Sequence, residues 1–176
     1  MEEPEPATIR AATAGDLDAF EDIVRAYQVP VWRFLRQLLG DASLAEDVTQ
    51  ETFVRVFERL ASFSGRSKFS TWLLQVARNA GTDALRRRAR HHRLTEALPV
   101  PRPVAAADSG SELVVALQSL SAKLREAVLV VEIFGMSYRE AASVLAVPEG
   151  TVKSRVAEGR RQLLGWLAAG ERADEM

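Results

Sequence analysis

Apolar residues recur at steps of three and four along most of this chain, which is the spacing of the buried face of an amphipathic helix. The first such segment spans residues 16–39. Its apolar positions are Leu17, Phe20, Val24, Tyr27, Val31, Leu35 and Leu38. Pro30 lies inside this segment and is predicted to kink it or to divide it into two helices, because proline has no amide donor. Gly40 and Asp41 are predicted to end it.

A second helix is predicted to begin at Ser43, since Ser43 and Glu46 have the spacing of a capping box. Its apolar face consists of Ala45, Val48, Thr49, Thr52, Phe53, Val56, Phe57 and Leu60. Its opposite face carries Glu46, Asp47, Gln50, Glu51 and Arg55. Acidic residues in the first turns of a helix stabilise it through the helix dipole. From composition alone we therefore favour helix stabilisation over a docking role for Asp47 and Glu51.

The stretch from Ser64 to Arg93 contains a polar loop, a cluster of aromatic and hydroxyl residues, and a third amphipathic helix for which Ser70 is the predicted N-cap. The apolar face of this helix consists of Trp72, Leu73, Val76, Ala77, Ala80, Ala84 and Leu85. On its other face a stripe is formed by Arg78, Thr82, Arg86 and Arg90. The stripe is flanked by Asn79, Asp83 and Arg87. Guanidinium groups bind phosphates, while amide and carboxylate groups can read base edges. This face therefore predicts a contact with nucleic acid.

Charge is segregated along the chain, although the net charge of the whole sequence is only −1. Residues 66–93 contain eight Lys or Arg and one acid, a net +7, whereas residues 16–65 contain nine acids and five bases, a net −4. A local field of this size suits a polyanion, and an ordinary solvated helix end is the alternative. Trp72 is expected in the core, whereas for Phe69 a core position and a base-stacking role both remain open.

Residues 94–112 contain three prolines within five positions, followed by Ala, Asp, Ser and Gly, and they predict a flexible linker between two domains. The segment after it reads as all helical. A short helix has its apolar positions at Leu113, Ala116, Leu117 and Leu120. Ser121 can cap the next helix, which is predicted to run to Gly135 with Leu124, Val128 and Val131 facing inward.

Ser137 and Glu140 form a further capping box, followed by a turn at residues 146–148 and a final helix with Val152, Val156, Leu163 and Leu167 inward. Ala142, Ala146 and Val152 fit the packing pattern of a helix-turn-helix, although glycine is usual where Ala146 stands. Thr151, Lys153, Ser154 and Arg155 then point outward where a recognition helix meets the major groove, together with Glu149 and Glu158. Arg160 and Arg161 are expected to contact phosphates. The alternative is an exposed helix of a small bundle.

Other classes of protein are disfavoured. The chain has no cysteine, so it forms neither disulfides nor thiolate metal sites, and His91 and His92 are read as part of the basic end rather than as metal ligands. Nothing resembles a phosphate-cradling P-loop or an HExxH site, so we expect no catalytic residues, no metal and no cofactor. No apolar run approaches a membrane span, and the acidic, proline-containing residues 1–15 are expected to be disordered. A cytoplasmic location is expected.

Three stretches carry a resemblance to a known family: DASLAEDVTQETFVRVFERL, then KFSTWLLQVARNAGTDALRRRAR, and LREAVLVVEIFGMSYREAASVLAVPEGTVKSRVAEGRRQLL after the linker. In this order they resemble an extracytoplasmic-function (group IV) sigma factor of the sigma-70 family of bacterial RNA polymerase. The resemblance implies an all-α fold of two small helical domains. Its divisions are a disordered N-terminus at 1–15, a sigma-two domain at 16–93, a linker at 94–112, a sigma-four domain at 113–167 and a C-terminal tail at 168–176.

The resemblance also implies roles for particular residues. Asp47, Gln50 and Glu51 would dock on the clamp helices of the largest polymerase subunit. The minus-ten element would be captured and melted by Lys68, Phe69, Ser70, Thr71 and Trp72, with Arg78, Asn79, Asp83, Arg86 and Arg87 along the path of upstream DNA. The minus-thirty-five element would be contacted by Thr151, Lys153, Ser154, Arg155, Arg160 and Arg161.

The implied function is that of an alternative sigma factor, which directs promoter recognition, DNA melting and transcription initiation without being an enzyme. Its implied partners are core RNA polymerase, including the beta-flap, promoter DNA and an anti-sigma factor. One departure concerns Ala157, Glu158 and Gly159, where the family often has further arginines, so no base contact is assigned to Glu158.

Two rival functions remain open from the sequence. A helix-turn-helix regulator that binds duplex DNA without polymerase accounts for the second domain, but it leaves the aromatic and hydroxyl residues before the arginine helix unexplained. A helical adaptor without DNA binding accounts for the caps, the linker and the solvated charges.

Overall fold

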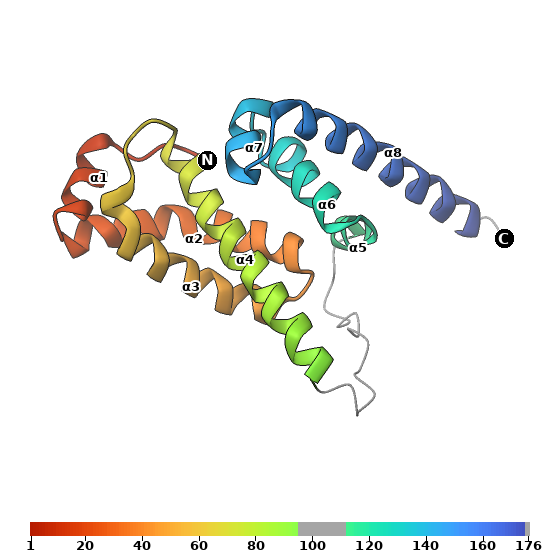
Figure 1. Ribbon diagram of the computed structural model, residues 1–176, viewed down its shortest axis with the longest axis horizontal. Helices are drawn as coiled ribbons and strands as arrows, with labels where there is room; N and C mark the ends of the chain where they lie inside the picture. The colour runs from red at the N-terminus through yellow and green to blue at the C-terminus, as the bar shows by residue number, and fades with distance from the viewer. Residues whose placement is uncertain (95–111, 175–176) are drawn as a thin grey trace.

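The structure is a computed structural model that describes residues 1–94 and 112–174. In these two ranges the regular elements are helices and there is no strand, as the all-α prediction requires. Figure 1 shows two groups of helices, α1 to α4 and α5 to α8, lying against each other. Residues 95–111 of the predicted linker lie outside the described ranges.

The first domain contains α1 (Pro6–Thr13), α2 (Leu17–Leu39), α3 (Ala42–Arg59), a 3-10 turn (Leu60–Ser62) and α4 (Phe69–Leu94). Helices α2, α3 and α4 pack on one another around fully buried side chains. Those with at most 2% exposure include Tyr27, Val31, Phe34, Leu35, Val48, Leu73 and Ala77. Gly81 lets α4 approach α2 closely, because a Cβ there would lie 3.0 Å from Leu38 Cδ2. The amphipathic periodicity of the sequence is thus realised as a three-helix core.

Several predicted helix ends differ from the observed ones. Helix α2 continues unbroken through Pro30, so it is not divided, and it ends as predicted at Gly40, whose φ of +74° is left-handed. The Ser43 capping box is wrong. Asp41 is the N-cap of α3 instead, and its carboxylate accepts from the Leu44 amide at 3.0 Å. Asp41 was assigned to the end of the preceding helix, and because it caps α3 the helix begins at Ala42, two residues earlier than a cap at Ser43 would allow.

The predicted disorder of residues 1–15 does not hold for α1. Pro6 occupies the first position of this helix, where proline costs no hydrogen bond, and Ala12 is buried. The segment before it is attached to the domain, since the Tyr27 hydroxyl donates to the Glu2 carbonyl. The prediction rested on charge and proline content, and it missed these tertiary contacts.

The second domain contains α5 (Glu112–Ser119), α6 (Ala122–Val128), a π-helical segment (Leu129–Ile133), α7 (Tyr138–Leu145) and α8 (Glu149–Asp174). Ser121 stands at the N-cap of α6, although its side chain makes no capping hydrogen bond. The Ser137 and Glu140 capping box is confirmed at the start of α7. Helix α8 extends through most of the tail that was predicted to begin at residue 168.

The predicted helix-turn-helix is present as α7, a tight turn and α8. Ala146 ends α7 with a φ of +53°, a left-handed conformation that glycine adopts more easily than alanine. Val152 is fully buried on the inner side of α8. Gly159 lies against α6, where a Cβ would approach Val128 Cγ2 to 2.5 Å. The turn and the glycine together fix how α8 packs and which face it exposes.

The two domains share an interface formed by α2 and α4 on one side and α5, α6, the π-helical segment and α7 on the other. The Phe34 and Phe134 rings meet edge to face with centroids 5.5 Å apart. The Arg125 guanidinium donates to the Leu38 carbonyl at 2.9 Å, and the Gln118 amide donates to the Gln37 carbonyl at 2.9 Å. These donors bind carbonyls at the C-terminal end of α2, which favours positive charge.

Candidate nucleic-acid interface

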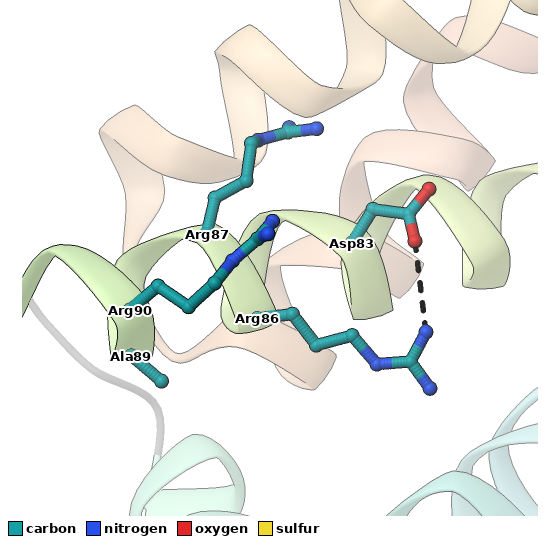
Figure 2. Close-up of a pocket in the computed structure, with 5 residues that line it drawn as sticks. All are labelled: Asp83, Arg86, Arg87, Ala89 and Arg90. Carbon is teal, nitrogen blue, oxygen red and sulfur yellow. Dashed lines mark ion pairs between the residues drawn. The ribbon is translucent and has the colours of Figure 1, made fainter.

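The outer face of α4 presents the predicted arginine stripe. Figure 2 shows the side chains of Asp83, Arg86, Arg87 and Arg90 around a shallow pocket that Ala89 also lines. Arg86 and Arg90 are exposed, and Arg86 lies 3.8 Å from the Asp83 carboxylate. Three guanidinium groups around one open depression form a surface that suits a phosphate-bearing ligand.

The same face is connected to α3 by an ionic network. Arg55 lies between two acids, with its guanidinium 2.6 Å from Glu51 and 2.9 Å from Asp83. Arg87 lies 2.8 Å from the other Glu51 oxygen. The hydrogen bond to Asp83, followed by that to Glu51, raises the pKa of Arg55 above its ordinary value. Glu51, predicted for polymerase docking, thus shares its contacts with Asp83 and Arg87, predicted for DNA.

The two other predicted docking residues, Asp47 and Gln50, are exposed on α3, whereas Glu51 is half-buried. They lie one helical turn apart on the face opposite the core, so all three can meet a partner together.

The start of α4 is an aromatic cluster. Phe69 is only 1% exposed, and its ring lies 5.5 Å from Tyr27, 5.4 Å from Phe63 and 5.7 Å from Trp72 between centroids. Of the two roles left open for Phe69, a core position and base stacking, this conformation shows the core position. Trp72, expected in the core, is half-buried instead. Thr71 is buried beside them.

Ser70 is not the N-cap of α4, because the helix begins at Phe69 and the Lys68 carbonyl already accepts from the Trp72 amide. The Ser70 side chain is buried. The amides of Phe69 and Ser70 donate instead to the Glu3 carboxylate, at 2.7 Å and 3.3 Å. Sequence reasoning missed Glu3, since a contact across 66 residues leaves no local pattern.

Two cations that were predicted for minus-ten DNA bind acids of the second domain. Lys68 lies 2.8 Å from Glu140, and Arg78 lies 2.9 Å from Glu126. The Lys68 ammonium, with the Ser137 hydroxyl and amide, lowers the pKa of Glu140 to about 2. Asn79 is exposed on the same helix. Sequence reasoning assigned Glu140 only to the capping box and gave Glu126 no role, because neither contact is local in the sequence.

The second predicted DNA surface is the first half of α8. Lys153 and Ser154 are exposed, and Thr151 and Arg155 are half-buried. The Lys153 ammonium lies 2.9 Å from Glu149 and 5.6 Å from the centre of the Tyr138 ring. These contacts leave the Lys153 side chain exposed at the surface of α8.

The two arginines further along α8 bind acids in this conformation. Arg160 lies 2.6 Å from Glu132, and Arg161 pairs with Glu158, which also accepts from Gln162 at 2.7 Å. Sequence reasoning missed Glu132, which reaches α8 from the π-helical segment.

Within the described ranges, no three His, Cys, Asp or Glu side chains are grouped so that they could hold a metal ion. In the same ranges, no helix is both long enough and apolar enough to cross a membrane.

Comparison with protein families gives two matches in chain order. The family described as Sigma-70 region 2 matches residues 23–91, which cover α2 to α4. The family described as Sigma-70, region 4 matches residues 111–163, which include the helix-turn-helix.

Full-length relatives agree with these matches. The chain is 36% identical over 160 residues to the ECF RNA polymerase sigma factor SigC of Mycobacterium tuberculosis, an alignment that covers 88% of this chain and 86% of the relative. It is 33% identical over 172 residues to the ECF RNA polymerase sigma factor SigW of Bacillus subtilis, covering 88% and 92%.

Two solved structures are similar to the whole arrangement. One is the sigma factor RpoE bound to the anti-sigma factor NepR from Bartonella quintana, with a TM-score of 0.74, 27% identity, and coverage of 85% of this chain and 96% of that one. The other is CnrH in complex with the cytosolic domain of CnrY, with a TM-score of 0.72, 26% identity, and coverage of 93% and 96%.

Proposed function

The chain belongs to the sigma-70 family of RNA polymerase sigma factors, in its extracytoplasmic-function group, and from this premise we propose how its surfaces direct transcription initiation. The observation that carries the proposal is the pair of separate cationic helix faces, on α4 and α8, each within the matching sigma-70 region. One face suits the minus-ten element and the other the minus-thirty-five element.

The exposed face of α3 is the proposed polymerase contact. Asp47 and Gln50 are open to solvent, and Glu51 lies beside them. Carboxylates and an amide on one helical face can pair with basic residues of a partner helix, here the clamp helices of the largest polymerase subunit. The second domain would contact the beta-flap. Phosphodiester synthesis belongs to the polymerase, so this chain needs no catalytic group of its own, and it acts in the cytoplasm with the polymerase.

The proposed minus-ten surface combines the start of α4 with its arginine stripe. Arg86 and Arg87 hold phosphates of upstream DNA, and Asn79 and Asp83 offer groups for base edges. Lys68, Phe69, Ser70, Thr71 and Trp72 receive the melted strand. Extruding a base costs a few kcal/mol, which stacking and hydrogen bonds to the captured strand offset.

The proposed minus-thirty-five surface is the N-terminal half of α8. Lys153 and Arg155 donate to base edges, with Thr151 and Ser154 beside them. Arg160 and Arg161 hold phosphates further along the helix. Their present acidic partners are exposed or half-exposed, so solvent already competes for these ion pairs.

An anti-sigma factor is a further proposed partner. One of the two similar solved structures is a sigma factor bound to an anti-sigma factor, and the other is also a complex with a second protein. A protein that covers the Asp47 face and the Arg155 face together would block polymerase and promoter at once.

The test is transcription in vitro with core polymerase free of sigma factors, the purified chain and a library of promoter-like fragments. We expect initiated RNA only in the presence of the chain and from a subset of fragments. Trp72→Ala and the double variant Lys153→Ala/Arg155→Ala should each lower initiation by about tenfold or more. The control is Arg25→Ala, whose guanidinium pairs with Glu21 within α2.

A different result would assign the chain to another class. If no fragment is transcribed, while the chain alone binds duplex DNA tightly, the chain is a helix-turn-helix regulator that acts without polymerase. If the double variant binds and initiates like the wild type, the α8 surface is not the promoter reader.

A further inference from the structure

The first turn of α4 receives its cap from the opposite end of the sequence. Lys68, directly before the helix, has no side-chain oxygen, and the Ser67 hydroxyl donates to the Lys68 carbonyl rather than accepting from an amide of the helix. The Glu3 carboxylate takes this place and binds the amides of Phe69 and Ser70 at 2.7 Å and 3.3 Å. A helix N-terminus binds carboxylates and phosphates by the same means, amide donors and the positive end of the dipole.

The segment that carries Glu3 is held at two further points. The Tyr27 hydroxyl donates to the Glu2 carbonyl, and Tyr27 in turn packs on Phe69. Burial, with a smaller contribution from the charges of Glu3 and Glu2, raises the pKa of Tyr27, so the phenol remains a donor. Figure 1 shows the N-terminus beside the start of α4 and facing α7. Glu3 itself is exposed, so water can reach its carboxylate and another anion can compete with it for the same amides.

A second acid reaches the same turn from the other domain. Glu140 of α7 lies 2.8 Å from the Lys68 ammonium, whose pKa is raised by this contact and, to a smaller degree, by Glu3. The hydroxyl of Thr71, in this same turn, is buried without a hydrogen-bond partner. The carboxylates of Glu3 and Glu140, neither of which belongs to α2, α3 or α4, thus lie at the first turn of α4. This turn also holds the Thr71 hydroxyl, which has no hydrogen-bond partner.

We propose that Glu3 is an autoinhibitory group: its carboxylate occupies the position on the first turn of α4 where a phosphate of the nontemplate minus-ten strand binds, and it must leave before DNA is captured. The inference rests on the proposed function, since that function places promoter DNA at this turn. The occupant is part of the same chain, so it competes at high effective concentration until polymerase presents DNA at a still higher one. Glu140 in the same way occupies the Lys68 ammonium, which would otherwise be open to a phosphate.

A purely structural cap predicts the opposite effect on DNA. If Glu3 only stabilises α4, its removal loosens the turn and weakens DNA binding or leaves it unchanged. If Glu3 competes with a phosphate, its removal strengthens DNA binding. Glu3→Gln separates the two, because the amide oxygen can still accept from Phe69 while the negative charge is lost.

Glu5→Gln is the matched control. Glu5 lies in the same acidic segment, is exposed and makes no side-chain hydrogen bond at the start of α1. The two variants therefore change the net charge of the chain equally, and nonspecific attraction for DNA rises equally in both. Only Glu3→Gln removes the carboxylate from the first turn of α4.

The experiment measures the fluorescence anisotropy of a labelled single-stranded DNA that carries the nontemplate minus-ten sequence recovered from the promoter library, with labelled oligo(dT) as a second probe. We expect Glu3→Gln to bind about two- to fivefold more tightly than Glu5→Gln, the range that a charge at a helix terminus supplies. Circular dichroism verifies that both variants are folded. Equal binding by the two variants, weaker binding by Glu3→Gln, or no measurable binding by either overturns the proposal.

Transcription with core polymerase separates this inference from the proposed function. If the wild type initiates but the two variants bind DNA equally, the inhibition is rejected and the sigma function stands. If Glu3→Gln binds either probe more tightly but no variant initiates, Glu3 does shield a DNA surface, and the polymerase function is rejected.

Discussion

Arg78 of α4 and Glu126 of α6 form an ion pair of 2.9 Å that joins the two domains in a largely buried setting. The Glu126 side chain is only 9% exposed, and the Arg78 side chain 20%. One Arg78 nitrogen, Nε, is buried without a partner. Arg78 is therefore occupied by the second domain in the conformation described, although its proposed role is at the DNA.

Arg78→Ala should open the two domains. The substitution leaves the Glu126 carboxylate buried and unpaired at a cost of about 1 to 3 kcal/mol, which separation of the domains relieves by hydrating it. Small-angle X-ray scattering should give a larger radius of gyration than for the wild type. Arg25→Ala breaks an exposed pair within α2 and should leave the radius unchanged. A compact Arg78→Ala would show that the apolar contacts alone hold the domains together.

The contact between Lys68 and Glu140 should depend on pH in the acidic range. Because the pKa of Glu140 is lowered to about 2, the folded state binds its proton less readily than the unfolded state does. The stabilisation is thus fully present above the ordinary Glu pKa of about 4.3 and disappears as the pH falls toward 2.

Glu140→Gln tests this pH dependence, because glutamine still completes a capping box but carries no charge for Lys68. The melting temperature of the wild type should exceed that of Glu140→Gln at pH 6, and the two should converge toward pH 2. A difference that persists at pH 2 would mean that the charge of Glu140 is not its source.

Local chemistry explains most of what could be predicted from the sequence. The Ser137 and Glu140 capping box and the Gly40 helix end depend on residues at most a few positions apart, and both were found as expected. The helix-turn-helix follows from the same kind of signal. Of the two outcomes predicted for Pro30, the division of the helix does not occur, since the fixed φ of proline is compatible with a helix that continues around it.

Contacts between distant segments could not be predicted in this way. The bonds from Phe69 and Ser70 to Glu3, and the pair between Arg78 and Glu126, join residues 48 to 67 positions apart. No periodicity specifies such a partner, because any exposed acid could serve a given cation equally well. The docking of one domain on the other decides which acid does.

Glu51 and Asp47 should differ in their effect on stability. Glu51→Gln removes the carboxylate shared by Arg55 and Arg87, and it should lower the free energy of unfolding by at most about 1 kcal/mol, since the pairs are partly exposed. Asp47→Asn should leave that free energy unchanged, because Asp47 is exposed on α3. Both should weaken core-polymerase binding in a pull-down titration. If Asp47→Asn binds core like the wild type, the α3 face is not the docking surface.

Ala146→Gly should stabilise the second domain. Alanine at a φ of +53° is strained, and glycine relieves about 1 kcal/mol even though it is more flexible in the unfolded state. Urea denaturation followed by circular dichroism measures the change. Ala157→Gly, at an exposed position within α8, should instead destabilise by about 1 kcal/mol. Destabilisation by both variants would mean that the turn gains nothing from glycine.

Substitution of Arg155 and substitution of Arg160 should change promoter binding in different ways. Arg155 lies near the start of α8, where side chains reach base edges, so Arg155→Ala should relax the preference at one minus-thirty-five position, with a discrimination loss of about 1 to 3 kcal/mol. Arg160 lies further along α8, where we propose that it contacts a phosphate, and in this conformation it pairs with Glu132 from the π-helical segment. Arg160→Ala should therefore weaken all promoters alike and reduce the salt dependence of binding by about one counterion.

Sequencing of the RNA initiated from the promoter library, at two salt concentrations, reads both effects in one assay. A uniform loss with Arg155→Ala would make Arg155 a phosphate contact. A changed base preference with Arg160→Ala would mean that α8 enters the groove further along its length than Thr151 and Lys153 imply, because Arg160 follows them by more than one helical turn.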